Sequence, residues 1–232
     1  MILPELRKVR RLKIMPLVFV MVIAVVLMSS FPMFRKNVEL ANVEMLMMIT
    51  LMQAFLAPVF VSIVATQLVE IEHSGNGWQI SGSMGISRGQ LCVTKAIVAG
   101  AIITATTTVE LLIIVGLLSV FQVSDINFPA WITYGIGLVV VNLILCMLHV
   151  IVAALVDNQL VNIGVGVLGA FFGVFSLLPV VVSYIQPWGY YAVISPVAQT
   201  AAGMDYVEPN YIAVALFCLP WIGSFCGKRK IS

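Results

Sequence analysis

Residues 45–69 read MLMMITLMQAFLAPVFVSIVATQLV, a stretch of 25 residues without a charged side chain. A helix needs about 20 predominantly apolar residues to cross the roughly 30 Å hydrocarbon core of a bilayer. The stretch is therefore predicted to form a membrane-spanning helix. Pro58 lies inside it and is expected to bend that helix, because proline removes a backbone hydrogen bond and crowds the preceding turn.

The rest of the chain repeats this pattern. Hydrophobic residues make up 61% of the 232 residues and charged residues 9%, and the mean hydropathy is +1.10. This composition excludes a soluble globular fold. We predict an all-α polytopic membrane protein, a single transmembrane domain over residues 1–232 with six transmembrane helices. The other five predicted spans are residues 14–34, 95–121, 131–156, 161–185 and 211–226.

The first apolar run follows a basic stretch, as a signal peptide would. It is long and no small-residue cleavage site ends it, so we interpret it as a retained helix. Residues 1–13 form the basic stretch, and two interpretations of it stay open. It lies as an amphipathic helix on the anionic inner leaflet, or it is a basic flank that only sets topology.

The basic residues are distributed unevenly between alternate loops. If the N-terminus is cytoplasmic, ten of the twelve lysines and arginines lie on the cytoplasmic side, and only Arg35 and Lys36 lie outside. Cytoplasmic loops of membrane proteins carry such an excess. We therefore expect both termini and the loop of residues 70–94 to face the cytoplasm. The net charge of +2 gives no reason to expect a nucleic-acid partner.

Two chemical motifs are absent from the sequence. The four cysteines, at positions 92, 146, 218 and 226, show neither CxxC nor Cys/His ligand spacing, so we interpret them as small apolar packing residues and expect no metal site. No G-x-x-x-x-G-K-[ST] pattern occurs either. The chain is therefore not expected to hydrolyse ATP by that chemistry, and ATP-driven work requires a separate partner.

The longest polar loop follows the second apolar run, where residues 67–95 read QLVEIEHSGNGWQISGSMGISRGQLCVTK. Glu70 and Glu72 end the second run, a glycine-rich segment follows, and Lys95 opens the third run. Glycine permits sharp chain reversal. We therefore expect the loop to present a short helix beyond the membrane face, in a position suited to docking against a soluble protein.

This arrangement resembles the membrane subunit of ABC-2-type transporters. The similarity rests on the acidic residue that ends the second span, the glycine-containing turn, the Ser87-Arg88 pair and the lysine that starts the third span. Within that class the chain is most similar to the small permeases of lantibiotic-immunity and bacitracin-resistance exporters. Many relatives carry a proline shortly before the Ser-Arg pair, where this chain has Ile86.

The resemblance implies a transport subunit that is not itself an enzyme. Its coupling helix would fit a groove on an ABC ATP-binding subunit, present in two copies, which binds ATP and Mg, while this chain binds no cofactor. A second permease subunit, identical or homologous, would complete the assembly in the bacterial cell membrane and expel an amphiphilic antimicrobial peptide. The alternative is a solvated loop whose charges only set topology. The residues matched to the ATPase contact are Glu70, Glu72, His73, Ser87, Arg88 and Lys95.

Three of the polar residues inside predicted spans are candidate site residues. Glu110 lies midway along the third run, and an acidic group at a helix centre costs about 2.5–3.5 kcal/mol on insertion scales. It either lines the translocation path or a permease contact, or it joins helices through hydrogen bonds. Asn142 and His149 lie seven residues apart on one face of the fourth run and are candidates for interhelical hydrogen bonds.

Two competing functions remain from these residues. One is an intramembrane hydrolase that uses Glu110 and His149, which is disfavoured because no nucleophile motif or metal-ligand cluster accompanies them. The other is a non-catalytic membrane sensor or assembly subunit.

Two further segments have a composition that predicts their surroundings. Gly169 and Gly173 form a small-xxx-small pair that permits close helix approach, within the subunit or at a dimer seam. Residues 186–210 combine prolines with tryptophan and tyrosine, which favour the membrane interface. We predict an extracellular re-entrant or interfacial segment there, and a plain interfacial loop is the alternative.

Overall fold

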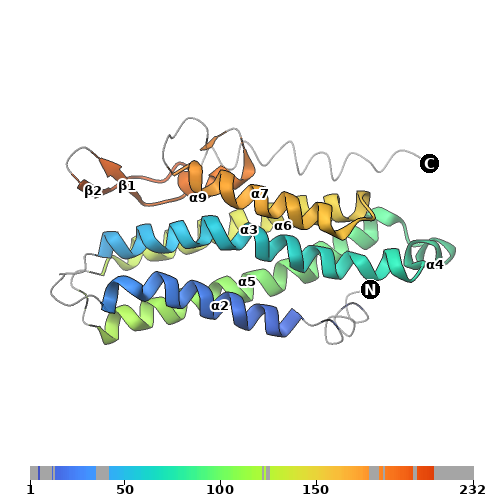
Figure 1. Cartoon of the computed structure of the whole chain (residues 1–232), viewed down its shortest axis with the longest axis horizontal. Helices are drawn as coiled ribbons and strands as arrows, with labels where there is room; N and C mark the ends of the chain where they lie inside the picture. The colour runs from blue at the N-terminus through green and yellow to red at the C-terminus, as the bar shows by residue number, and fades with distance from the viewer. Residues whose placement is uncertain are drawn as a thin grey trace.

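The computed structural model describes residues 5, 12, 14–34, 42–121, 123, 126–177, 183–184, 186–200 and 203–211. Five apolar helices run side by side along the long axis of the molecule (Figure 1): α2 (Ile14–Ser30), α3 (Asn42–Ser74), α5 (Arg88–Val120), α6 (Phe128–Leu155) and α7 (Gln159–Phe175). The shorter elements are η1 (Phe31–Phe34), α4 (Gly77–Ser83), η2 (Pro187–Gly189), α9 (Tyr190–Val193), β1 (Val197–Thr200) and β2 (Gly203–Tyr206). Helix α4 lies at one end of the bundle and the two strands lie at the other.

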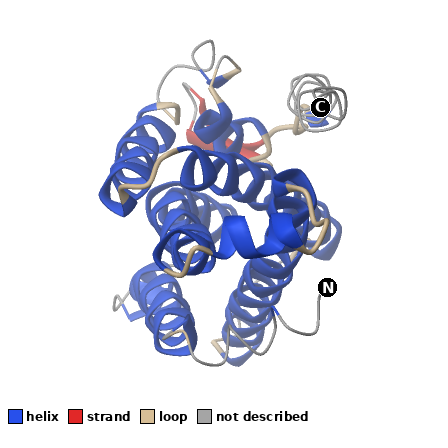
Figure 2. Cartoon of the chain, turned by 90° about the vertical axis from the view of Figure 1, so that its right-hand side faces the viewer, coloured by secondary structure: helices blue, strands red, loops and turns tan. Residues whose placement is uncertain are grey.

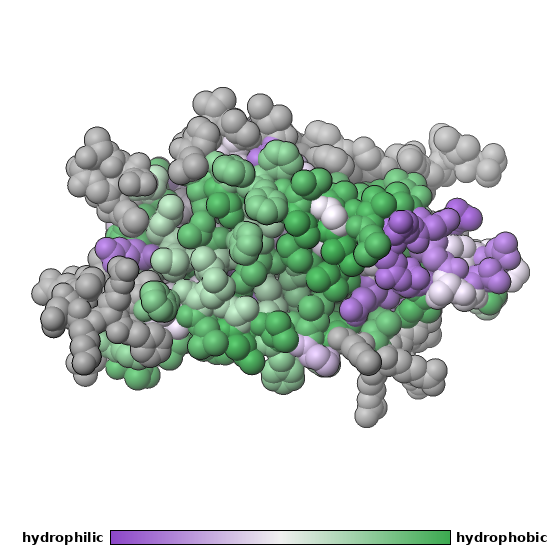
Figure 3. All heavy atoms as spheres, in the orientation of Figure 1, coloured by the Kyte–Doolittle hydropathy of each residue, from purple (hydrophilic) through white to green (hydrophobic). Residues whose placement is uncertain are grey.

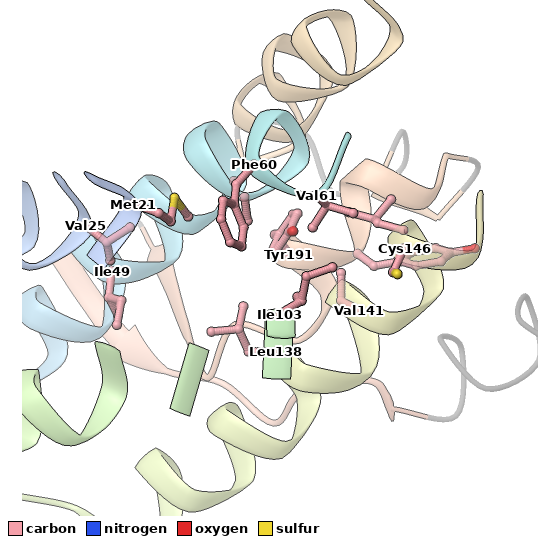
Figure 4. Close-up of a cluster of buried hydrophobic side chains, with 14 of the residues drawn as sticks. Met21, Val25, Ile49, Phe60, Val61, Ile103, Leu138, Val141, Cys146 and Tyr191 are labelled. Carbon is pink, nitrogen blue, oxygen red and sulfur yellow. The ribbon is translucent and has the colours of Figure 1, made fainter. Parts of the chain in front are cut away.

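Helix α3 is the central element of the bundle. It packs against α2, α5, α6 and α7. Figure 2 shows the bundle viewed along its helices. The buried cluster in Figure 4 combines side chains from several helices: Met21 from α2, Phe60 from α3, Ile103 from α5, Leu138 from α6 and Tyr191 from α9. This packing brings the end of α3 close to the first turns of α5, and the polar loop connects these two helices.

The outer faces of the helices are apolar as well. Phe19, Leu112, Ile136 and Phe171 are large hydrophobic residues that lie more than half exposed. Figure 3 shows hydrophobic residues over the middle of the molecule and hydrophilic residues gathered at the end that carries α4. Helices α3, α5 and α6 are long and apolar enough to cross a membrane, and α2 and α7 are apolar but shorter. A mostly helical integral membrane protein is therefore confirmed.

Five of the six predicted spans correspond to these five helices, but several of the helix ends differ from the predicted ones. Helix α7 ends at Phe175, with Ser176 as its C-cap, whereas the prediction extended to residue 185. Helix α3 continues to Ser74 and α5 already begins at Arg88. Much of the expected loop of residues 70–94 is therefore helical, since these helices do not end where the apolar residues end.

The number of spans and the side on which the termini lie stay predictions. The sixth predicted span, residues 211–226, lies outside the described residues except for Tyr211. The basic segment of residues 1–13 also lies outside them except for Glu5 and Leu12.

Residues 186–210 depart from the all-α expectation. They form η2, α9 and an antiparallel pair of strands in which Val197 faces Tyr206 and Thr200 faces Gly203. Pro196 explains why α9 ends at Val193, because proline restricts the residue before it to extended conformations.

Candidate functional site

The polar loop between α3 and α5 owes its shape to turn residues and to one helix cap. Asn76, just before α4, and Gly85, just after it, have φ of 52° and 75°, and such left-handed conformations reverse the chain sharply. Helix α5 then begins with a capping box. The Ser87 side chain accepts from the Gln90 backbone N–H at 3.2 Å, and the Gln90 side chain accepts from the Ser87 N–H at 3.0 Å. Ser87 thus fixes the start of α5.

A buried ionic cluster joins the loop to the bundle. The Lys95 side chain is 0% exposed, and its Nζ lies 3.0 Å from a Glu5 carboxylate oxygen and 3.0 Å from a Glu72 carboxylate oxygen. It also donates to the Leu68 carbonyl at 2.6 Å. Three donors therefore meet three acceptors, as a desolvated ammonium group requires. We call Glu5, Glu72 and Lys95 the Lys95 cluster; it connects the N-terminal segment, the end of α3 and the start of α5.

Helix α4 packs directly on this cluster. A Cβ atom added to Gly77 would collide with the Glu72 carboxylate and lie 3.0 Å from the Glu72 Cα. On the same helix, a Cβ atom at Gly82 would meet nothing within 4 Å. Glycine is therefore required at the start of α4 by the close approach of Glu72.

We expect Gly77→Ala to lower the stability of the protein by about 1–3 kcal/mol, the usual cost of overpacking. The Glu72 carboxylate would have to move, which weakens its contact with Lys95. Gly82→Ala is the matched control, expected to be neutral or slightly stabilising because alanine favours helix. Thermal unfolding of both variants in detergent tests this, and equal melting temperatures for the two would contradict the expectation.

His73 connects α3 to two other elements. Its Nε2 lies 3.0 Å from the Ala153 carbonyl and must donate to it, since a carbonyl only accepts. Its Nδ1 lies 3.3 Å from the Trp78 indole nitrogen and 2.8 Å from an Asp157 carboxylate oxygen. The neutral ring accepts from Trp78, whereas the charged ring donates to Asp157. The Arg88 guanidinium lies 5.8 Å from the centre of the Trp78 ring, within cation–π range.

These residues surround a cleft of about 400 Å³, called the α4 cleft below. Four of the residues predicted for the ATPase contact line the cleft: Glu70, Glu72, His73 and Arg88. The other two do not: Lys95 is buried against Glu72, and Ser87 caps α5. Sequence reasoning missed Glu5, Trp78 and Asp157. Glu5 is the only acidic residue in the basic segment 1–13, which is the one signal that singles it out. The lining residues are Glu70, Glu72, His73, Ser74, Asn76, Trp78, Gln79, Arg88 and Asp157.

Glu110 and Asn142, two of the polar residues predicted inside the spans, are buried and bind neighbouring helices. Glu110 accepts a hydrogen bond from the Gln53 side-chain amide of α3 at 2.7 Å. Asn142 donates to the Thr107 hydroxyl of α5 at 3.0 Å and accepts from the Tyr191 hydroxyl at 2.6 Å. These contacts join α5 to α3 and to α6.

His149 belongs to a separate network. Its Nδ1 lies 2.9 Å from the Asn162 side-chain oxygen of α7, and Asn162 donates to the Thr66 hydroxyl of α3 at 2.8 Å. Among the described residues, no hydrogen bond links His149 with Glu110. The structure therefore does not bring these two together into one constellation of the kind a hydrolase would need.

Gly169 and Gly173, the α7 glycines predicted to permit close packing, have different neighbours. A Cβ atom at Gly173 would lie 2.8 Å from the Ala54 carbonyl oxygen, so this glycine permits the close approach of α7 to α3. A Cβ atom at Gly169 would instead collide with the Trp188 indole, which belongs to η2. Trp188 also stacks against Phe172 with an interplanar angle of 26°. Gly169 thus makes room for residues of the 186–210 segment.

The apolar helices form a bundle typical of an integral membrane protein. The short helix α4 is attached to one end of this bundle, beyond its apolar middle. The chain belongs to the ABC-2 family transporter proteins, whose family model matches residues 1–173. It is thus a membrane permease of an ABC transporter, a transport subunit that associates with an ABC ATPase subunit. Neither a curated protein nor a solved structure matches the chain.

Proposed function

We propose that this chain is the permease subunit of an ATP-driven exporter, and that α4 is the element on which the ATPase subunit acts. The observation that carries the proposal is the attachment of α4 to the Lys95 cluster. Gly77 contacts Glu72, and Glu72 pairs with Lys95 at the start of α5. A displacement of α4 is therefore passed to α3 and α5 together, as in a rigid-body transition.

The same cluster supports the proposed orientation. The ion pair between Glu5 and Lys95 supports placing the N-terminal segment and α4 on one side of the membrane. The excess of basic residues in the N-terminal segment supports the cytoplasm as that side, and we propose the bacterial cell membrane as the location. Two ATP-binding subunits, which hold ATP and Mg, and a second permease subunit, identical or homologous, complete the transporter; this chain binds no cofactor of its own.

We propose an amphiphilic antimicrobial peptide of the lantibiotic or bacitracin type as substrate. The similarity of the polar loop to that of the immunity and resistance permeases supports this choice. The extensive apolar outer faces of the helices also support a position of the permease within the bilayer, to whose interface amphiphilic peptides bind. The permease would expel the peptide from the membrane to the outside.

Survival of bacterial cells that express this chain together with its ATP-binding subunit tests the function. Nisin and bacitracin serve as the probes, and a variant ATPase without its Walker A lysine is the control. We expect raised survival with the intact pair against at least one probe, and no protection with the variant. Equal survival with and without the chain for both peptides would refute the substrate assignment.

We propose that Glu110, Asn142 and His149 join helices within the subunit, because each binds a partner on another helix. We expect Glu110→Gln to retain transport, since an amide keeps the contact with Gln53. Glu110→Ala leaves the Gln53 amide without its acceptor and is expected to cost about 1–3 kcal/mol of stability. Transport assays and thermal unfolding of both variants test this. A stable Glu110→Gln variant without transport would instead assign the carboxylate to the path or to catalysis.

A further inference from the structure

We infer that the α4 cleft receives an arginine side chain of the ATPase subunit; this inference rests on the proposed function. The residues that line the cleft include Trp78 and Gln79 of α4. Helix α4 lies at one end of the molecule (Figure 1), and hydrophilic residues gather at that end (Figure 3). Its lining carries three carboxylates, from Glu70, Glu72 and Asp157, against the guanidinium of Arg88. The cleft is therefore acidic, unlike the basic N-terminal segment.

In the ranges that the structure describes, Lys95 and Arg88 do not form ion pairs with Glu70 or Asp157. Lys95 is committed to the buried cluster with Glu72 and Glu5. Arg88 is held against the Trp78 ring, and within the described part of the chain it forms no ion pair with a carboxylate. His73 compensates Asp157 only when its ring is protonated.

Glu70 and Asp157 are thus the two anionic groups open to a partner. Glu70 takes part in no ion pair among the described residues, and the Asp157 side chain is 92% exposed. They come from different elements, Glu70 from the end of α3 and Asp157 from the turn between α6 and α7. A cation held between them would bind both elements at once.

The shape of the acceptor set favours a guanidinium group. Asn76 and Gln79, whose side chains each carry an acceptor oxygen, line the cleft beside the two acidic residues. Arginine presents five N–H donors in a planar fork, which suits several oxygen acceptors at once better than the compact ammonium group of lysine. An anionic lipid headgroup would be repelled by the same lining. Among the described residues, no group of three His, Cys, Asp or Glu side chains is placed to hold a metal ion.

The test compares the affinity of the full-length chain, in nanodiscs, for the purified ATPase subunit at several salt concentrations. The variant Glu70→Gln/Asp157→Asn removes both charges and keeps the side-chain shapes. Its matched control is Glu44→Gln/Glu208→Gln, which removes two exposed charges at the other end of the bundle. We expect the first variant to bind about 10-fold more weakly or worse at low salt, with a shallower salt dependence, and the control to bind as the wild type does.

A charge exchange identifies the partner residue. Glu70→Arg should abolish binding, and one Arg→Glu substitution among the arginines of the ATPase subunit should restore it. Rescue would also show that the Glu70→Arg variant folds. If the wild-type chain binds the ATPase subunit and Glu70→Gln/Asp157→Asn binds it with the same affinity and salt dependence, the cleft inference is wrong while the proposed function stands. If the wild-type chain does not bind the ATPase subunit, both fail.

Discussion

Lys95→Met is expected to lower the stability of the protein by about 3–5 kcal/mol, the cost of removing one partner from a buried ion pair. The side chain is fully buried, and its loss leaves the carboxylates of Glu5 and Glu72 without the ammonium group that both contact. Thermal unfolding in detergent measures the effect. A variant as stable as the wild type would show that the cluster is not a structural element.

A companion variant separates stability from coupling. Glu5→Gln/Glu72→Gln/Lys95→Met removes every charge of the Lys95 cluster, and replacing a whole buried ion pair is often close to neutral for stability. We expect this variant to recover most of the stability lost in Lys95→Met but to couple ATP hydrolysis poorly to transport. Recovery of both properties would mean that the cluster only holds the fold together.

The second large effect is expected at Gly173. In Gly173→Ala the new methyl group would lie 2.8 Å from the backbone oxygen of Ala54, which no side-chain rotation relieves. Helices α3 and α7 would have to separate, and we expect a loss of about 1–3 kcal/mol. Gly164→Ala on the same helix is the control, because a Cβ atom there meets nothing within 4 Å. Thermal unfolding of the two variants compares them, and equal stabilities would contradict the close packing of α3 on α7.

Hydropathy predicted the helices better than it predicted their ends. Runs such as residues 45–69 have to be buried in lipid or protein, so their helical state follows from composition. The ends depend on local chemistry that hydropathy does not report. Helix α3 continues through Glu70 and Glu72 to Ser74, and the left-handed Asn76 follows before α4 begins. The capping box at Ser87 begins α5 seven residues before Lys95.

The sequence identified most of the residues of the candidate site because they lie within one segment. It missed the partners that the tertiary fold brings from elsewhere. Glu5 lies 90 positions from Lys95, and Asp157 lies in a short turn between two apolar runs. No periodicity joins such residues. For the same reason the sequence did not indicate that Trp188 is the neighbour of Gly169.

The contact between Glu5 and Lys95 has a practical consequence for work with the protein. Four residues span no more than about 14 Å, so an affinity tag fused ahead of Met1 starts within that distance of Glu5. It would emerge on the face where the ATPase subunit is proposed to dock, and would compete with it for space. Purification handles intended to preserve the assembled transporter therefore belong elsewhere on the chain.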